Sequence, residues 1–176
     1  MTRDIRFPAL LLAIPAMLAC SLLQAGAEPE GVVIELAEDI SPAPDSFSLV
    51  ELHPPQGDLS ALLAAHAGLA AEAGRRPFVE VSAEWCPSCR LLDRGLEDAR
   101  MIDAFRGTYI LRLDIDEWKS RLSRAGFFVV GVPVFFEVDE AGDPTGRNLT
   151  GAAWGPDVPE NMAPVLREFF RGAGEE

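Results

Sequence analysis

The stretch that decides the fold reads Pro77-Phe78-Val79-Glu80-Val81-Ser82-Ala83-Glu84-Trp85-Cys86-Pro87-Ser88-Cys89-Arg90. Its first part is rich in apolar and β-branched residues, which predicts a buried strand over residues 77–82. Proline at position 87 suits the first turn of a helix, where a missing N–H costs nothing. The sequence therefore predicts a strand that passes directly into a helix over residues 87–96, with Cys86 at the junction.

The two cysteines stand one helical turn apart at this junction. We expect the Cys86 sulfur to be partly exposed at a helix N-terminus. The unpaired N–H groups and the dipole there favour its thiolate, and Ser88 can offer the sulfur a further donor. Cys89 is then placed to resolve a mixed disulfide formed at Cys86. A zinc site needs about four ligands, and only His53 and His66 remain, at no ligand spacing. We therefore expect redox chemistry, with no metal and no cofactor.

Composition excludes some classes of function. The chain has 176 residues, of which 48% are hydrophobic, so it is long enough for one domain with a core. Its formal net charge is −13. Nucleic-acid binding needs clustered basic side chains, so we expect no nucleic-acid partner.

Residues 1–27 have the pattern of a secretory signal peptide. Arg3 and Arg6 precede an uncharged apolar run over residues 7–23, and an A-x-A site predicts cleavage after Ala27. Two alternatives stay open. The apolar run approaches the length that spans a bilayer, so it could remain as an anchor, or Cys20 could be lipidated.

Cleavage after residue 27 changes the cysteine count. Cys20 leaves with the leader, and Cys86 and Cys89 alone remain. A disulfide between residues so close together closes a small ring and hardly constrains the unfolded chain. This pairing again indicates a redox function rather than a structural staple.

Strands and helices alternate along the rest of the chain. We expect strands over residues 47–52, 77–82, 108–115, 132–138 and 147–151, and helices over 59–73, 87–96, 99–105, 117–125 and 159–171. A hairpin turn is expected over residues 139–143. This order predicts a mixed α/β sheet in a domain spanning residues 46–172, preceded by an extension or linker over residues 28–45.

The order of elements, taken with four motifs, resembles the thioredoxin superfamily. The motifs are Ala83 to Arg90 between strand and helix, Gly131-Val132-Pro133 opening a later strand, Leu113-Asp114-Ile115-Asp116, and the turn over residues 139–143. The resemblance covers residues 47–171. It implies a thioredoxin fold, with a central mixed sheet of four to five strands flanked by helices and ending in a β-hairpin and a C-terminal helix.

The resemblance also implies roles around the cysteine pair. Cys86 corresponds to the nucleophile and Cys89 to the resolving cysteine. Glu80 occupies the family's buried acidic position, usually aspartate, which exchanges a proton with the resolving cysteine. Arg112 stands where a lysine often pairs with that acid and modulates it. Two plainer readings stay open, in which Glu80 points outward and Arg112 is an ordinary surface residue.

Other residues are expected to contact the substrate. By resemblance, Trp85 shields the first sulfur and contacts partners, although core packing is the alternative. Pro133, if its peptide bond is cis, presents the Val132 backbone to an extended substrate. Gly151 and Trp154 could line the same groove, and for Trp154 we favour ordinary packing.

These inferences lead to an expected function. The chain is similar to exported thiol:disulfide oxidoreductases that act on protein thiols or disulfides in the periplasm, with a membrane redox protein as electron partner. We expect a reductase, because residues 90–132 leave no room for the helical insertion that oxidases of the family carry. An oxidase or isomerase is the alternative, and a non-catalytic binding module is the alternative of another class.

Overall fold

The computed structural model describes residues 46–172. The elements follow in the order β1 (Ser48–Leu52), α1 (Leu59–Glu72), β2 (Arg76–Ser82), α2 (Pro87–Gly95), α3 (Ala99–Phe105), β3 (Thr108–Asp114), α4 (Ile115–Arg124), β4 (Val134–Val138), β5 (Pro144–Thr150) and α5 (Pro159–Arg171). Two short 3-10 turns, Pro54–Gln56 and Gly151–Ala153, were not expected from the sequence. The predicted leader and the extension over residues 28–45 lie outside the described residues.

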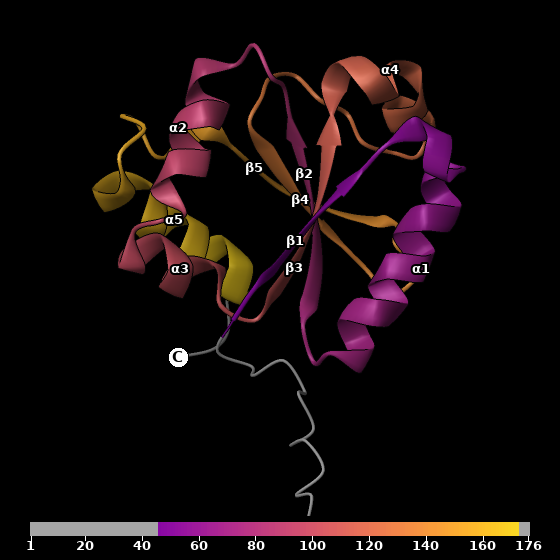
Figure 1. Cartoon of the computed structure of the whole chain (residues 1–176), viewed down its shortest axis with the longest axis horizontal. Helices are drawn as coiled ribbons and strands as arrows, with labels where there is room; N and C mark the ends of the chain where they lie inside the picture. Colours follow the sequence, from indigo (N-terminus) through magenta and orange to yellow (C-terminus); the bar gives the residue numbers. More distant parts are fainter. Residues whose placement is uncertain (1–45, 173–176) are drawn as a thin grey trace, which may run out of the picture. The chain divides into compact units, whose positions relative to one another are not determined.

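One five-stranded sheet forms the middle layer, with strand order β1-β3-β2-β4-β5. β3 lies parallel to both β1 and β2, whereas β4 runs antiparallel to β2 and β5 antiparallel to β4. Helices α1 and α4 cover one face, and α2, α3 and α5 cover the other (Figure 1). This is the thioredoxin fold, so the predicted fold class is confirmed.

The central strand β2 is buried on both faces, which is why its sequence is almost continuously apolar. Val79 and Val81 pack into a cluster with α1 and α4, and Phe78 packs into a second cluster of aromatic residues from α3, β4 and α5. Alternation along the strand places Glu80 on the same face as Phe78, beneath α2. Glu80 is the one charged residue at this depth of the strand, with 1% of its surface exposed.

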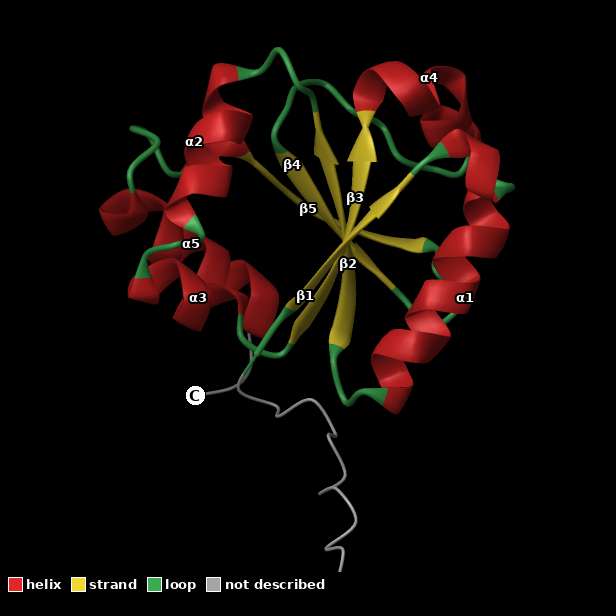
Figure 2. Ribbon diagram, viewed as in Figure 1, coloured by secondary structure: helices red, strands yellow, loops and turns green. Residues whose placement is uncertain are grey.

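The carboxyl ends of β2 and β3 lie at the same end of the sheet, where β2 leads through a short loop into α2 and β3 passes directly into α4 (Figure 2). α4 begins at Ile115 rather than at residue 117, because the Asp114 side chain accepts hydrogen bonds from the backbone N–H groups of Asp116 and Glu117. No helix within residues 46–172 has the length and apolar character needed to cross a bilayer.

Other expectations from the sequence need correction. β4 begins at Val134 rather than at residue 132, since Pro133 has no N–H to give to the strand ladder. β5 begins at Pro144 rather than at residue 147. The spacing of Leu69 predicts a place near the apolar face of α1, but Leu69 is 48% exposed, because the buried face follows Leu59, Leu63, Ala67 and Ala70.

Candidate active site

The cysteine pair lies where the loop after β2 enters α2. Cys86 is the N-cap of this helix, and its Sγ accepts a hydrogen bond from the backbone N–H of Cys89 at 3.1 Å. The two residues form a disulfide, with their Cα atoms 5.3 Å apart. The donor and the helix dipole will stabilise negative charge on Cys86 once the disulfide is reduced.

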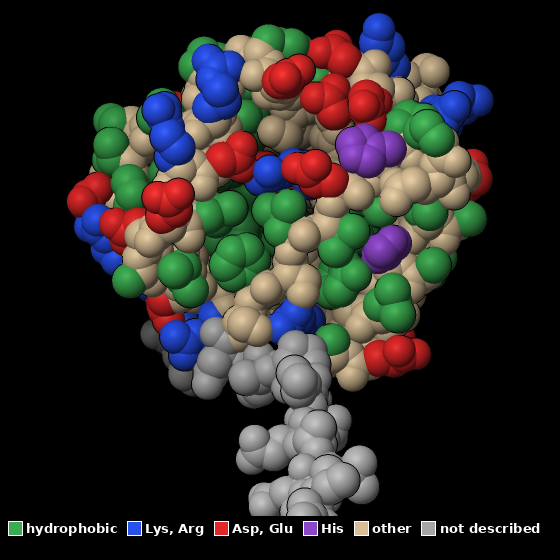
Figure 3. Space-filling view, viewed as in Figure 1, with side chains coloured by type: hydrophobic (Ala, Val, Ile, Leu, Met, Phe, Trp, Pro, Cys, Tyr) green, Lys and Arg blue, Asp and Glu red, His purple; other side chains and the backbone are tan. Residues whose placement is uncertain are grey.

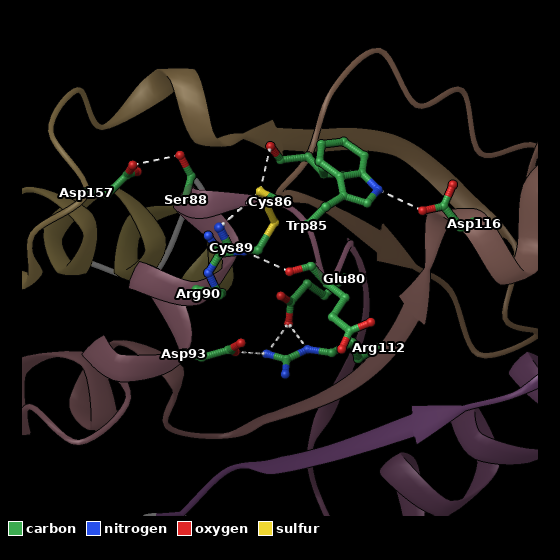
Figure 4. Close-up of a disulfide and its surroundings, with 12 residues drawn as sticks. Glu80, Trp85, Cys86, Ser88, Cys89, Arg90, Asp93, Arg112, Asp116 and Asp157 are labelled. Atoms are coloured by element: carbon green, nitrogen blue, oxygen red, sulfur yellow. Dashed lines mark hydrogen bonds and ion pairs between the residues drawn. A yellow bond between two sulfur atoms is a disulfide. The ribbon is translucent and has the colours of Figure 1, made fainter.

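The disulfide is more enclosed than the sequence led us to expect. Cys86 was expected to be partly exposed, but it is 3% exposed, because Ile115 and Val132 pack around the pair. The carbonyl oxygen of Val132 lies 3.6 Å from the Cys86 Sγ, and the Val132–Pro133 peptide bond is cis (Figure 4). A partner disulfide must therefore enter a shaped surface beside Val132 to reach the sulfur.

The backbone at Gly151, directly after β5, packs against Pro133. The Gly151 N–H donates a hydrogen bond to the Pro133 carbonyl oxygen at 2.9 Å. A Cβ at position 151 would lie 3.1 Å from a Pro133 ring carbon, closer than most such contacts. Glycine is therefore the residue that allows β5 to approach the substrate-facing proline.

Glu80 lies beneath the disulfide, with its carboxylate between the Arg112 guanidinium and the cysteine pair (Figure 4). One oxygen, Oε2, accepts a hydrogen bond from Arg112 Nε at 3.1 Å. The other oxygen, Oε1, is buried and has no partner among the described residues. Burial raises the pKa of the Glu80 carboxyl, and the positive charge of Arg112 opposes that shift. A carboxyl of this kind can take up and release a proton closer to neutral pH.

Arg112 holds three carboxylates together. Besides Glu80, it lies 2.5 Å from an Asp93 oxygen and 3.7 Å from a Glu51 oxygen. Glu51, Arg112 and Glu80 are register partners on β1, β3 and β2. The Arg112 side chain is 15% exposed, so it is largely buried among these carboxylates.

The sequence did not reveal Asp93 and Glu51 as members of this cluster. Asp93 follows Cys89 by one helical turn, so the two residues lie on the same face of α2. Glu51 becomes visible only with the register between β1 and β3. The cluster borders a cavity of about 480 Å³, and Figure 3 shows carboxylates gathered around a basic side chain there, with a histidine nearby.

The Glu80 environment makes a prediction about stability. A carboxyl whose pKa is raised by folding stabilises the fold fully below its unfolded pKa of about 4.3, and this contribution is lost as pH rises through the raised value. Each unit of the raised pKa corresponds to about 1.4 kcal/mol. Between about pH 4 and pH 8, wild-type protein will lose more unfolding free energy than Glu80→Gln. Urea unfolding at several pH values measures this, and parallel curves for the two proteins would contradict it.

On one side of the disulfide the surface is apolar. Trp85 is 61% exposed, Phe128 is 76% exposed and Val130 is 93% exposed. Trp85 therefore does not pack in the core, and its Nε1–H donates to Asp116 at 2.7 Å. These side chains border a hollow of about 540 Å³ between the loop before α2, the helix α4 and the loop before β4.

On the other side of the disulfide the surface is more polar, and it carries one carboxylate. The Ser88 hydroxyl donates a hydrogen bond to Asp157 at 2.7 Å, rather than to the Cys86 sulfur as expected from the sequence. Trp154 Nε1–H donates to the second oxygen of Asp157 at 2.9 Å. Trp154 is buried, as favoured from the sequence. Sequence reasoning missed Asp157, because nothing in its neighbourhood links it to the cysteine motif. A hollow of about 420 Å³ lies here, lined by residues that include Ser88, Val132, Gly151 and Asp157.

Neither histidine forms a hydrogen bond with the cysteine pair. His53 pairs with Glu117 at 2.9 Å, and His66 Nδ1 lies 3.0 Å from the Tyr109 hydroxyl. Within residues 46–172, no three side chains of the metal-binding types lie close enough to hold a metal ion.

No family model and no curated protein matches this sequence. Among solved structures, the chain is similar to a thioredoxin from Trypanosoma brucei brucei, with 18% identity and a TM-score of 0.47 over 70% of this chain and 88% of that one. A poplar thioredoxin h is 18% identical, with a TM-score of 0.44 over 69% of this chain and 96% of that one. An oxidised thioredoxin from Plasmodium falciparum is 15% identical, with a TM-score of 0.45 over 71% of this chain and 99% of that one. Because these identities and TM-scores are low, we assign the fold from the strand order and strand directions of the sheet.

Fold and geometry together define a class of site. A Cys-x-x-Cys pair at disulfide distance, at a helix N-terminus of a thioredoxin fold, is suited to thiol–disulfide exchange.

Proposed function

We propose that this chain is a thiol:disulfide oxidoreductase that reduces disulfides in protein substrates. The observation that carries the proposal is the Cys86–Cys89 disulfide at the start of α2, directly above the buried Glu80. A pair with no redox use would not need a buried carboxyl beneath it. Such a group costs free energy of folding unless it is partnered.

The reaction begins with the reduced pair. The Cys86 thiolate attacks one sulfur of the partner's disulfide, that S–S bond breaks, and a mixed disulfide forms while the other partner sulfur leaves as a thiolate. Cys89 then gives its proton to Glu80 and attacks the Cys86 sulfur. The mixed disulfide breaks, the Cys86–Cys89 disulfide forms, and the partner leaves with two electrons and takes up protons as a dithiol.

Two features support the reducing direction. A carboxylate beneath the pair disfavours nearby thiolate, and therefore disfavours the reduced form that a strong oxidant stabilises. The segment between Cys89 and Pro133 holds only the end of α2 with α3, β3 and α4, so it carries no inserted helical domain.

The cellular setting is a second part of the proposal. The leader pattern over residues 1–27 supports export to the periplasm, either as a cleaved protein or attached to the membrane. There the oxidised pair needs an electron donor, for which we propose a membrane redox protein.

Reduction of insulin with dithiothreitol as electron donor tests the activity. We expect catalysed precipitation of the released chains in proportion to protein concentration, and no acceleration by a Cys86→Ser, Cys89→Ser double variant. A wild-type protein that gives only the uncatalysed rate would refute the proposal and favour the non-catalytic binding module.

The exposed apolar side chains make a further prediction. A contiguous apolar surface beside the reactive pair fits contact with proteins rather than small thiols. Phe128→Ser will raise KM for a protein disulfide by about three- to tenfold and leave the rate with a small disulfide unchanged. Ile102→Ser, an exposed apolar residue of α3, is the matched control. Equal effects of the two variants would remove Phe128 from the contact surface.

A further inference from the structure

The redox pair is flanked by two hollows of different chemistry. Trp85, directly before Cys86, borders the apolar hollow, whereas Ser88, two residues after Cys86, borders the polar one. Val130 borders both. A substrate segment that places its cysteine over Cys86 therefore has one end above apolar side chains and the other end above a more polar surface that carries the Asp157 carboxylate.

Asp157 dominates the chemistry of the polar hollow. It is the single charged side chain among the residues that line it; the others are Ser88, Val130, Gly131, Val132, Pro133, Thr150, Gly151, Ala152 and Gly155. Because most of these side chains are small or absent, an incoming side chain has room to approach the carboxylate.

The hydrogen bonds of Asp157 fix its position without cancelling its charge. Ser88 and Trp154 are neutral donors, one to each oxygen. Within residues 46–172, Asp157 forms no ion pair with a basic side chain, in contrast to the carboxylates around Arg112. Each oxygen retains a further lone pair that can accept another donor.

We propose that Asp157 binds a lysine or arginine side chain of the substrate, so that this oxidoreductase prefers protein disulfides with a basic residue close to the attacked cysteine. The inference rests on the proposed function and adds the substrate class. A basic side chain supplies both the charge that Asp157 lacks and the N–H donors that its free lone pairs can accept. Asp157 is thus a specificity residue that contacts substrate, and it takes no part in the exchange of electrons.

The direct test uses short peptides whose single cysteine is joined to thionitrobenzoate in a mixed disulfide. Attack by reduced Cys86 on the peptide sulfur releases the coloured thionitrobenzoate anion. Lysine, glutamine or glutamate is placed one or two residues before or after the cysteine. Rate constants are measured for reduced wild type, Asp157→Asn, Asp157→Lys and the control Glu140→Gln, an exposed acid of the β4–β5 turn.

For at least one placement, we expect wild type to react about fivefold faster with the lysine peptide than with the glutamate peptide at low salt, a margin typical of one exposed ion pair. Asp157→Asn will remove most of that ratio, and Asp157→Lys will reverse it. Glu140→Gln will retain the ratio, since the overall negative charge attracts all basic peptides alike. Glu140→Gln will react at the wild-type rate with the small neutral hydroxyethyl disulfide, and each variant's peptide rates are divided by its own rate with that disulfide.

The outcomes separate this inference from the proposed function. If thionitrobenzoate is released equally fast from all peptides, or if Asp157→Asn and Glu140→Gln change the ratio equally, Asp157 does not select the substrate and the oxidoreductase proposal stands. If reduced wild type releases none from any peptide, both proposals are overturned.

Discussion

Cys89→Ser will trap the protein in a mixed disulfide with its substrate, and Cys86→Ser will form no such adduct. Cys86 receives the stabilising N–H at the start of α2 and lies beside the Val132 carbonyl, whereas Cys89 lies one turn further along the helix. Removing the resolving thiol leaves the mixed disulfide with no internal route to breakdown. Removing the attacking thiol reduces turnover to the uncatalysed rate.

Non-reducing electrophoresis, with mass spectrometry of the adduct, measures this difference. Wild type and the double variant serve as controls, and the adduct must dissolve on treatment with dithiothreitol. An adduct at position 89 in Cys86→Ser, with none in Cys89→Ser, would exchange the assigned roles of the two cysteines.

Glu80→Gln will slow turnover on the order of 100-fold near neutral pH, the range found for loss of a general base. The variant keeps the shape of the side chain but cannot accept the Cys89 proton. In wild type, Glu80 is an effective base above its raised pKa, so the rate should level off there. In the variant, the rate should climb with pH toward the ordinary thiol pKa of about 8.5, where solvent can remove the proton. The two profiles will converge at high pH.

Glu51→Gln is the matched control for this experiment. Glu51 belongs to the same Arg112 cluster but is largely exposed and lies 3.7 Å from the guanidinium. It should leave the pH profile of turnover near wild type. If Glu80→Gln gives a profile parallel to wild type, proton transfer through Glu80 is excluded, and a role in positioning Arg112 alone remains.

The fold was predictable because its strongest signals are local. The apolar run of β2 leads into a proline-started helix, and the strand–helix alternation continues to α5, so every strand and α-helix within residues 46–172 was predicted with the right type. Errors fell at element ends. At an element end, one side chain can determine the first residue of a helix. The Asp114 cap, for example, makes α4 begin at Ile115 rather than at residue 117.

The residues of the candidate site also fall into two groups, those predicted from local sequence and those that depend on contacts between distant segments. Cys86 and Cys89 follow from spacing, and the structure places Glu80, Arg112 and Pro133 around them. Asp157 and Asp93 depend on contacts between distant segments. Asp157 contacts Ser88 across 69 positions of sequence, and no pattern around Asp157 signals that contact. The spacing of Asp93 from Cys89 gives its helix face but not its partner Arg112. The exposed state of Phe128 was likewise not predictable, because an apolar residue in a loop is buried or exposed according to what the rest of the fold places over it.

The reduction potential of the Cys86–Cys89 pair is the most direct test of whether this chain is a disulfide reductase. Protein from residue 28 onward is equilibrated with glutathione and dithiothreitol buffers, and the fraction of free thiols is measured at each ratio. A disulfide reductase should show a reversible two-electron transition near the value of thioredoxin, about −270 mV. A value near −120 mV, typical of a strong disulfide donor, would contradict it and make this chain an oxidase.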